Sequence, residues 1–405
     1  MTVGNVVIVG GGIAGVSTAA ALRAGGFVGD VTLVDAGEFP YDRPPLSKEF
    51  LEGRKALADI ALQPPRWYDD NKIRLITQTS VTALHTGLGS VELSDGTTLS
   101  TDRVVLATGG RAARPPIPGS DGSRVHVLRT GEDADRLRVA LIPEARVLVV
   151  GAGLIGAEVA STAVDLGCDV VLVDPVRPPL TAALGSELAV WLHTLHTQRG
   201  VITLQAGVES LRDTTFGIEA RLTSVDLPRT FDVVVLGVGM VPETGLAASA
   251  GLEVDRGIIV DHRQTTSNPA VLAVGDPACT RHNGVLLPRT EHWEAAQHDG
   301  QRAAATILGT AVPADTAPWF WTDRHHRHVE VVGEMAAAED IVLRGTLGSA
   351  SFSAFGLRSG RVVAAVGVDE STAVRAARRL IDRGIAVDRD RLADPSTDLR
   401  KLLRG

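Results

Sequence analysis

The sequence predicts an α/β protein with two parallel-sheet domains of the βαβ type and a smaller C-terminal α+β domain. Two glycine-rich turns support this prediction, because each follows an apolar strand and opens a helix. After residue 320 the pattern changes, and alternating strand patterns surround one amphipathic helix at 371–383. A chain of 405 residues is also too long for one ordinary core, so two or three domains are expected.

Each βαβ unit consists of a strand, a glycine turn, a helix and a second strand. The predicted ranges are 5–9, 13–24 and 31–35 for the first unit and 146–150, 154–166 and 169–174 for the second. Alternating residues at 91–94, followed by the turn Asp95-Gly96, predict a β-hairpin. The other predicted strands are 104–106, 231–236, 271–274, 329–332, 341–344 and 361–368.

Composition and charge exclude several classes of protein. The net charge of −8 argues against general nucleic-acid binding, and no apolar run is long enough for a transmembrane helix. A strand begins almost directly after Met1, which leaves no room for a secretion signal, so a cytoplasmic protein is expected. The two cysteines, Cys168 and Cys279, form no C-x-x-C pair, so a disulfide framework, a structural zinc site and a dithiol redox centre are all disfavoured.

The first glycine turn is Gly10-x-Gly12-x-x-Gly15, and Asp35 ends the next predicted strand. The first glycine permits the tight turn, the second lets a pyrophosphate approach the backbone amides, and the third lets helix and strand pack closely. An acidic residue at this distance hydrogen-bonds a ribose hydroxyl. The unit is therefore predicted to be a Rossmann-like dinucleotide site.

The second turn, Gly151-x-Gly153-x-x-Gly156 with Asp174, repeats every element. Because a flavin must take hydride from a donor, we expect FAD in the first unit and a nicotinamide nucleotide in the second. Asp174 favours NADH over NADPH, since a carboxylate would repel the 2′-phosphate. Arg177 lies nearby in the sequence and could instead accommodate a 2′-phosphate, but the simpler interpretation is that it is a solvated charge in a loop.

These residues resemble the FAD-dependent, NAD(P)H-linked ferredoxin reductases of the putidaredoxin-reductase and oxygenase-coupled type, within the glutathione-reductase-like class. The resemblance covers nearly the whole chain. It is based on the following segments: the two glycine turns, Arg43-Pro44-Pro45-Leu46-Ser47-Lys48, Ala107-Thr108-Gly109, Ala273-Val274-Gly275-Asp276, Arg289-x-Glu291-His292-Trp293, Pro318-x-x-Trp321-x-Asp323 and Leu392-Ala393-Asp394-Pro395.

The resemblance implies a discontinuous FAD-binding domain at 1–112 and 241–319, an NAD(P)H-binding domain at 113–240 and a C-terminal interface domain at 320–405. It also implies a set of cofactor-binding residues. These are Gly10, Gly12, Ile13, Ala14, Gly15, Asp35, Arg43, Lys48, Val81, Ala107, Thr108, Gly109, Arg114, Gly151, Gly153, Leu154, Ile155, Gly156, Glu158, Asp174, Gly237, Val238, Gly239, Gly275, Asp276, Glu291, His292, Trp293 and Trp321.

Four of the implied site residues are expected to act in catalysis. Arg43 and Lys48 would lie beside the isoalloxazine with Pro45 against its face, because fixed cations stabilise the charge of the reduced ring. Glu158 would lie near the nicotinamide carboxamide and could pair with Lys48. The structural alternative for Arg43 and Lys48 is a pair of solvated surface cations. The alternative for Glu158 is an acidic residue that the helix dipole favours in the first turn.

Other implied roles concern the ribityl chain and the faces of the rings. Asp276 would bind the ribityl chain, Trp293 would close over the flavin edge, and Trp321 would line the nicotinamide cavity. The structural alternative for Asp276 is a residue of a turn or a helix N-cap. The alternative for Trp293 and Trp321 is a place in the hydrophobic core. Cys279 is expected to be a buried filler.

The predicted function is hydride transfer from NADH to FAD N5, followed by single-electron transfer to a [2Fe-2S] ferredoxin that serves a P450 or oxygenase. The expected state is a monomer or homodimer. Two alternatives stay open: an NADH oxidase or reductase of a small acceptor, and a flavoprotein scaffold switched by NADH.

The arginines and histidines of the C-terminal region invite two further interpretations. A basic docking patch for an acidic ferredoxin is predicted at Arg302, Arg324 and Arg327 with neighbouring histidines. A metal site is not predicted at His292 or at His325, His326 and His328, because no ligand spacing is recognisable. The tract alternates with Arg324 and Arg327, which is typical of a solvated basic face. The segment Thr322-Asp323-Arg324-His325 departs from the family, which usually has Gln and an aromatic residue after the Asp.

Overall fold

The computed structural model describes residues 3–176, 178–223 and 225–403. The chain forms two compact units, each described here by itself. Unit 1 comprises the described residues of Met1–Arg43, Lys55–Arg111 and Met240–Asp315. Unit 2 comprises the described residues of Pro44–Arg54, Ala112–Gly239 and Thr316–Gly405. The chain therefore first passes from unit 1 to unit 2 between Arg43 and Pro44.

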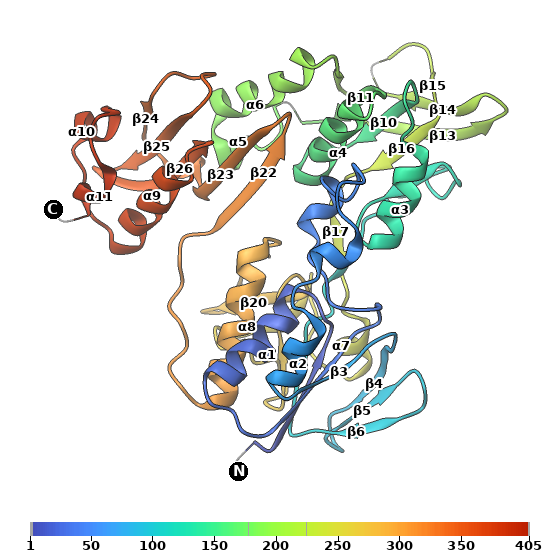
Figure 1. The fold of residues 1–405 in the computed structure, drawn as a ribbon, viewed down its shortest axis with the longest axis vertical. Helices are drawn as coiled ribbons and strands as arrows, with labels where there is room; N and C mark the ends of the chain where they lie inside the picture. Colours follow the sequence, from blue (N-terminus) through green and yellow to red (C-terminus); the bar gives the residue numbers. More distant parts are fainter. Residues whose placement is uncertain (1–2, 177, 224, 404–405) are drawn as a thin grey trace. The chain divides into compact units, whose positions relative to one another are not determined.

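Unit 1 is built on a five-stranded parallel sheet with the order β19-β7-β1-β2-β3. The strands are β1 (Asn5–Val9), β2 (Asp30–Val34), β3 (Ile73–Ile76), β7 (Arg103–Leu106) and β19 (Val271–Ala273). Apolar runs such as 6–9 are buried on both faces, as expected of a parallel sheet covered by helices. Helices α1 (Ile13–Ala24) and α8 (Trp293–Leu308) pack against each other (Figure 1). The first predicted βαβ unit is confirmed.

Smaller elements complete unit 1. A three-stranded antiparallel sheet contains β4 (Val81–His85), β5 (Ser90–Leu93) and β6 (Thr98–Ser100), so the predicted hairpin at Asp95-Gly96 is confirmed. The remaining elements are η2 (Leu57–Ile60), α2 (Pro65–Asp70), α7 (Gly245–Ser249), β18 (Ile258–Val260), β20 (Ala278–His282) and β21 (Val285–Leu286). Strands β8 (Gly110–Ala112) and β17 (Met240–Pro242) lie where the chain passes between the units.

Helices α1 and α8 approach closely at Gly300. A Cβ atom on Gly300 would lie 2.6 Å from the carbonyl oxygen of Ala14 and 2.9 Å from the amide nitrogen of Thr18. We expect Gly300→Ala to lower the free energy of unfolding by about 1–3 kcal/mol, because this clash exceeds the gain in helix propensity. Urea unfolding measures the change. Gly87→Ala, where a Cβ atom meets no heavy atom within 4 Å, is the matched control and should cost nothing.

Unit 2 contains a second five-stranded parallel sheet with the order β12-β11-β10-β16-β9. Its strands are β9 (Val125–Val127), β10 (Arg146–Val150), β11 (Asp169–Asp174), β12 (Ile202–Gln205) and β16 (Val233–Leu236). Its helices are α3 (Gly131–Ala140), α4 (Leu154–Asp165), α5 (Thr181–Leu184) and α6 (Ser186–Gln198). The second predicted βαβ unit is thus confirmed as β10, α4 and β11.

One predicted strand of unit 2 is divided in the structure. The range 231–236 splits into the end of β15 (Arg229–Phe231) and β16, because Asp232 between them accepts hydrogen bonds from the backbone and guanidinium of Arg146. Strand β15 instead joins β13 (Val208–Thr214) and β14 (Gly217–Leu222) in an antiparallel sheet.

The proline segment Pro44–Arg54 is anchored to the part of unit 2 that contains this parallel sheet. It forms the 3₁₀ helix η1 (Pro44–Ser47), and the fully buried Leu51 packs in the core that includes Val147 and Val159. The backbone carbonyl of Ser47 accepts a 2.8 Å hydrogen bond from Oγ1 of Thr162 on α4. Lys48 is therefore held next to α4 by its immediate neighbours in the chain.

The C-terminal part of unit 2 is a five-stranded antiparallel sheet with the order β22-β23-β26-β25-β24. Its strands are β22 (Trp319–Arg324), β23 (Arg327–Gly333), β24 (Asp340–Arg344), β25 (Phe352–Arg358) and β26 (Arg361–Val368). Helix α9 (Ser371–Arg383) packs on β26 with Ala373, Val374, Ala377 and Leu380 buried (Figure 1). Helices η3 (Met335–Ala337), α10 (Arg389–Ala393) and α11 (Leu399–Leu402) are short. The predicted α+β character is confirmed.

Among the described residues, none of the helices combines the length and apolar character needed to cross a membrane.

Candidate functional site

The first glycine turn, in unit 1, is fixed by two close backbone approaches. Gly10 has a φ of 112°, and a Cβ atom there would lie 2.2 Å from the carbonyl oxygen of Ala107. A Cβ atom on Gly15 would lie 2.0 Å from the carbonyl oxygen of Gly10. These two glycines are required by the packing of strand, turn and helix, as the sequence predicted.

The middle glycine of this turn faces a cation. A Cβ atom on Gly12 would lie 3.3 Å from Nη1 of Arg43, so the guanidinium lies over the N-terminal end of α1. At the end of β2, Asp35 accepts hydrogen bonds from the amides of Gly11 and, at 2.7 Å, Gly37. A small turn, a neighbouring guanidinium and a fixed carboxylate fit the pyrophosphate and ribose of a dinucleotide such as FAD. The predicted place of Arg43 beside the flavin ring stays a prediction.

The turn Gly275-Asp276 in unit 1 is supported by a residue that the sequence analysis missed. The amide of Gly275 donates a 3.1 Å hydrogen bond to Oδ2 of Asp299, and Gln264 donates a 2.9 Å bond to Oδ1. Burial raises the pKa of Asp299 to about 6, despite the opposing hydrogen bond from Gly275. No motif in the sequence signals this role, because Asp299 lies within helix α8, more than twenty positions from the turn.

The two aromatic residues predicted near this turn open helix α8. Trp293 is the first residue of α8, and its indole nitrogen donates a 2.8 Å hydrogen bond to Oδ1 of Asp42, the residue before Arg43. His292 is the N-cap, and burial lowers the pKa of its imidazole despite the opposing charge of Asp276. The 41–43 segment, the start of α8 and Asp276 therefore meet within unit 1.

The second glycine turn, in unit 2, repeats the geometry of the first. Gly151 has a φ of 95°, and a Cβ atom there would lie 2.4 Å from the carbonyl oxygen of Gly237. A Cβ atom on Gly156 would lie 2.0 Å from the carbonyl oxygen of Gly151. In contrast, a Cβ atom on Gly153 would meet no heavy atom within 4 Å. The middle glycine thus leaves open space at the N-terminus of α4, which fits an incoming pyrophosphate.

The surroundings of this second turn also suit a nucleotide. Two large apolar side chains, Ile155 and Val238, are 42% and 38% exposed, and Val238 lies next to Gly151. Asp174, at the end of β11, accepts 2.8 Å hydrogen bonds from the amides of Ala152 and Val176. The carboxylate is therefore fixed beside the turn. Arg177 lies outside the described residues.

Glu158, on the first turns of α4, is the centre of a buried polar cluster in unit 2. It is 3% exposed. Its carboxylate accepts hydrogen bonds from Oγ of Ser47 (2.6 Å), Oγ1 of Thr322 (3.0 Å) and the amide of Asp323 (3.1 Å). Nζ of Lys48 lies 3.5 Å away, so the predicted pairing of Lys48 with Glu158 is present. Ser47 lies within a recognised motif and Thr322 between two recognised residues, but the sequence predicts no role in the site for either of them.

A chain of alternating charges continues from Lys48. Its ammonium donates a 2.9 Å hydrogen bond to Oδ2 of Asp323, and Oδ1 of Asp323 lies 2.6 Å from Nδ1 of His328. Burial lowers the pKa of Lys48, but the charges of Glu158 and Asp323 outweigh this effect and raise it overall. Hydrogen bonds to Asp323 and Glu330 raise the pKa of His328 to about 10. Lys48, Asp323 and His328 are therefore charged at neutral pH.

Trp321 lies beside this chain of charges on β22. Nζ of Lys48 is 5.6 Å from the centroid of its ring, a cation–π distance. Trp319, on the same face of β22, lies 5.1 Å from Trp321 between ring centroids and donates a 2.9 Å hydrogen bond to Glu330. Trp321 is only partly buried, which is compatible with its predicted place in a nicotinamide cavity.

The predicted docking patch is wrong for Arg324. This residue is 2% exposed and cannot present its charge to a partner, because β22 runs next to α4 and turns the side chain toward the glycine turn. Arg327 forms an ion pair with Asp369, and Arg302 forms one with Asp315. The interpretation of the histidine tract as a solvated face is wrong for His325, which is 5% exposed.

His325 occupies the tip of the β22–β23 hairpin and enters the interior of unit 2. Both His325 and His326 have positive φ values, 51° and 62°, as a tight two-residue hairpin turn requires. The amide of His325 donates a 2.7 Å hydrogen bond to Oγ of Ser161, and its Nε2 lies 2.9 Å from Nδ1 of the fully buried His196. The hairpin tip is thus fastened to α4 and α6.

Acidification should release this buried histidine pair. Burial lowers the pKa of His196 from 6.5 to about 2 and that of His325 from 6.5 to about 4, and the charge of Arg324 acts in the same direction. In the unfolded chain these histidines bind protons near pH 6.5, whereas in the folded protein they bind them only at lower pH. The free energy of unfolding should therefore fall as the pH drops below 6.5 toward 4. Urea unfolding at several pH values measures this loss.

The matched variants for this prediction are His325→Asn and His282→Asn. Asparagine tolerates the left-handed backbone but does not titrate, so His325→Asn should flatten the pH dependence. His282 is exposed and lies in unit 1, so its replacement should leave the curve unchanged. An unaltered curve in His325→Asn would contradict the assignment.

The other predicted site residues lie at the ends of strands or the starts of helices. Ala107, Thr108 and Gly109 follow β7, and Gly237, Val238 and Gly239 follow β16. Ile13, Ala14 and Leu154 open α1 and α4, Val81 begins β4, and Pro45 lies in η1. Arg114 bonds the carbonyl oxygen of Ser120, and Glu291 pairs with Arg289. Both cysteines are buried, and the expected filler role of Cys279 is compatible with its 1% exposure.

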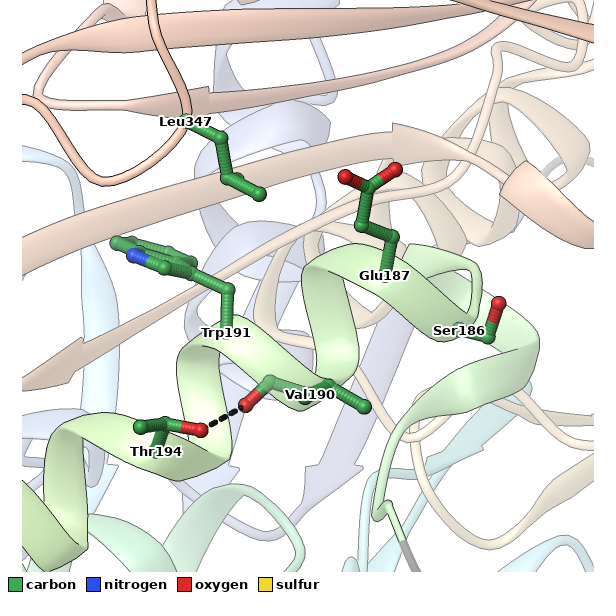
Figure 2. A pocket seen from close by; sticks show the side chains of 6 residues that line it. All are labelled: Ser186, Glu187, Val190, Trp191, Thr194 and Leu347. Atoms are coloured by element: carbon green, nitrogen blue, oxygen red, sulfur yellow. Dashed lines mark hydrogen bonds between the residues drawn. The ribbon is translucent and has the colours of Figure 1, made fainter.

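A surface pocket of about 420 Å³ lies elsewhere in unit 2, and none of the predicted site residues lines it. Figure 2 shows its lining by Trp191, Val190 and Glu187 of α6 and by Leu347, with Oγ1 of Thr194 donating a 2.8 Å hydrogen bond to the carbonyl oxygen of Val190. The prediction that nucleotides bind at the glycine turns therefore does not involve this pocket.

Comparison with known proteins decides the family. Residues 4–300 match the family model described as pyridine nucleotide-disulphide oxidoreductase. The chain belongs to this family. Residues 319–403 match a second model, described as reductase C-terminal. The predicted α/β fold and the prediction of an oxidoreductase are thereby confirmed.

Several members of this oxidoreductase family are similar over their full length. The chain is 38% identical to a benzene 1,2-dioxygenase system ferredoxin–NAD(+) reductase subunit of Pseudomonas putida, over 99% of this chain and 98% of the relative. It is 36% identical to putidaredoxin reductase of Pseudomonas putida, over 98% and 96%. Among solved structures, the covalent putidaredoxin reductase–putidaredoxin complex matches with a TM-score of 0.91 at 33% identity, covering 100% of this chain and 99% of that chain. The predicted resemblance is confirmed.

Proposed function

We propose that this member of the family is an FAD-dependent NADH:ferredoxin oxidoreductase. The observation that carries the proposal is the presence of two glycine turns with the same geometry, each with an aspartate fixed at the end of the next strand. Two dinucleotides are then expected, and a flavin with a nicotinamide is the pair that this family's oxidoreductase chemistry requires. The relatives are named as ferredoxin reductases of dioxygenase systems and as putidaredoxin reductase, which supports a [2Fe-2S] ferredoxin as acceptor.

The residues of unit 1 would hold FAD. Arg43 and the start of α1 would neutralise the charge of its pyrophosphate. Asp35 would accept a hydrogen bond from its ribose. Asp276, whose turn is held by Asp299, would face the ribityl chain. A bound flavin would supply the exchange between the two electrons of a hydride and single electrons. The side chains of the protein bind and orient the flavin and tune its electron affinity, and none of them is required as a nucleophile.

The residues of unit 2 would hold NADH. Gly153 leaves room for the pyrophosphate, and Ile155 and Val238 offer apolar contacts. Asp174 would accept a hydrogen bond from the ribose of the adenosine half. Because the carboxylate of Asp174 is held by two amides, it would repel a 2′-phosphate, so NADH is preferred to NADPH. Glu158 already accepts bonds from three donors beside Lys48, so its proposed role is to fix the charge of Lys48 next to the nicotinamide.

The test is a steady-state assay with purified, FAD-loaded protein. We expect NADH-dependent cytochrome c reduction that requires an added [2Fe-2S] ferredoxin and that NADPH supports poorly. Rapid oxygen consumption without a carrier protein would instead indicate an NADH oxidase. Slow flavin reduction combined with an NADH-induced change in oligomeric state would indicate a scaffold.

Several further assignments are part of the same proposal. We place the protein in the cytoplasm as a monomer or homodimer, with a P450 or oxygenase as the final electron acceptor. We retain the division into an FAD-binding domain at 1–112 and 241–319, an NADH-binding domain at 113–240 and an interface domain at 320–405. The sites of Arg43, Pro45 and Lys48 at the flavin ring belong to this proposal as well.

A further inference from the structure

The buried guanidinium of Arg324 lies beneath the second glycine turn. Its Nη2 donates a 3.3 Å hydrogen bond to the carbonyl oxygen of Gly153, the N-cap of α4, and its Nε donates a 3.2 Å bond to Oγ1 of Thr322. The side chain comes from β22, far from Gly153 in the sequence, and is 2% exposed. A cation from the C-terminal sheet thus supports the turn at which the dinucleotide is expected.

Among the residues that the structure describes, no carboxylate forms an ion pair with this guanidinium, and the charge that acts on it is that of Glu158. This carboxylate is shared, because it also lies 3.5 Å from Nζ of Lys48 and accepts hydrogen bonds from Ser47 and Thr322. The hydrogen bonds that Arg324 donates from Nε and Nη2 go to uncharged oxygen atoms, those of Thr322 and of the Gly153 peptide. Burial lowers the pKa of Arg324 to about 10, which leaves it protonated at neutral pH.

We propose that Arg324 is a positioning residue for the nicotinamide dinucleotide, acting on its pyrophosphate through the Gly153 peptide. By holding the Gly153 carbonyl oxygen on the side of β22, it keeps the amides of the turn directed to the opposite side, where Gly153 leaves open space. Its buried positive charge adds to that of the α4 N-terminus and is weakly screened by solvent. This inference rests on the proposed function, since it needs a dinucleotide at this turn.

The test is calorimetric binding of NAD⁺ and of ADP-ribose, which keeps the pyrophosphate but lacks nicotinamide, to the FAD-loaded protein. Arg324→Met keeps the length and apolar stem of the side chain, and Arg324→Gln keeps a hydrogen-bond donor; both remove the charge. We expect both variants to bind both ligands about tenfold more weakly. In NADH kinetics, KM should rise while kcat at saturation stays unchanged, and Arg324→Lys should recover part of the lost affinity.

The control is Arg327→Gln, three residues further along the same hairpin, where the guanidinium bonds Asp369 and the carbonyl oxygen of Ala350. It should bind NAD⁺ and ADP-ribose like the wild type. Wild-type ADP-ribose affinity in a folded Arg324→Met or Arg324→Gln would overturn the proposal, and so would an equal loss in Arg327→Gln. These binding constants need no ferredoxin, so failure of the proposed electron transfer can be distinguished from failure of this inference.

Discussion

Replacing Glu158 by alanine should lower the free energy of unfolding of unit 2 by about 3 kcal/mol, because it removes the charge that acts on the buried guanidinium of Arg324 and leaves Lys48 paired with Asp323. The carboxylate is 3% exposed and accepts bonds from Ser47, Thr322 and Asp323 next to Lys48. Its loss also leaves these buried donors unsatisfied. NADH-dependent reduction should fall strongly as well, since Lys48 loses one of the two carboxylates that hold it. Urea unfolding and stopped-flow reduction measure the two effects.

A surface ion pair of the same unit provides the control. Glu219 pairs with Arg212 at 2.8 Å, and the two side chains are 32% and 70% exposed. Glu219→Ala should cost less than about 1 kcal/mol and leave the reduction rate unchanged. If Glu158→Ala proved as mild as Glu219→Ala, the buried cluster would not have the energetic role assigned to it.

Replacing Gly153 by valine should abolish tight NADH binding while the fold is retained. The Gly153 backbone is extended, with φ −66° and ψ −157°, so a β-branched residue fits it. The added side chain would occupy the open space in which the pyrophosphate is expected. We expect the Kd for NADH to rise about 100-fold, equivalent to about 2.8 kcal/mol. The free energy of unfolding should fall by no more than about 1 kcal/mol, the usual scale of an N-cap change.

The third glycine of the same turn should behave in the opposite way. A Cβ atom on Gly156 would lie 2.0 Å from the carbonyl oxygen of Gly151, so Gly156→Ala should destabilise the fold itself. Isothermal titration and urea unfolding of both variants separate the two roles. Unchanged NADH affinity in a folded Gly153→Val protein would refute the assignment of the nucleotide to this turn.

The two βαβ units could be predicted from the sequence because their determinants are local. Gly10 and Gly151 adopt positive φ values between an apolar strand and a helix, and this combination leaves a pattern within a few residues. The fixed aspartates Asp35 and Asp174 follow from the same spacing. The hairpin at Asp95-Gly96 was predictable for the same reason, since its turn chemistry is encoded in two adjacent residues.

Contacts between distant segments could not be predicted in this way. Arg324 seemed a surface charge because its neighbours are polar and basic, yet β22 packs next to α4 and buries it against Gly153. His325 entered the interior for the same reason. Asp299 accepts a hydrogen bond from Gly275 and Asp323 accepts one from Lys48, and both partners lie far away in the sequence. A local pattern of residues does not predict such contacts.

The most direct test of the account is an anaerobic titration of the purified, FAD-loaded protein with NADH, followed in the visible absorption of the flavin. The account predicts that one equivalent of NADH bleaches the flavin and that two equivalents of oxidised [2Fe-2S] ferredoxin restore its colour, because each cluster accepts a single electron. A chain that retains no FAD, or a bound flavin whose spectrum NADH leaves unchanged, would contradict it.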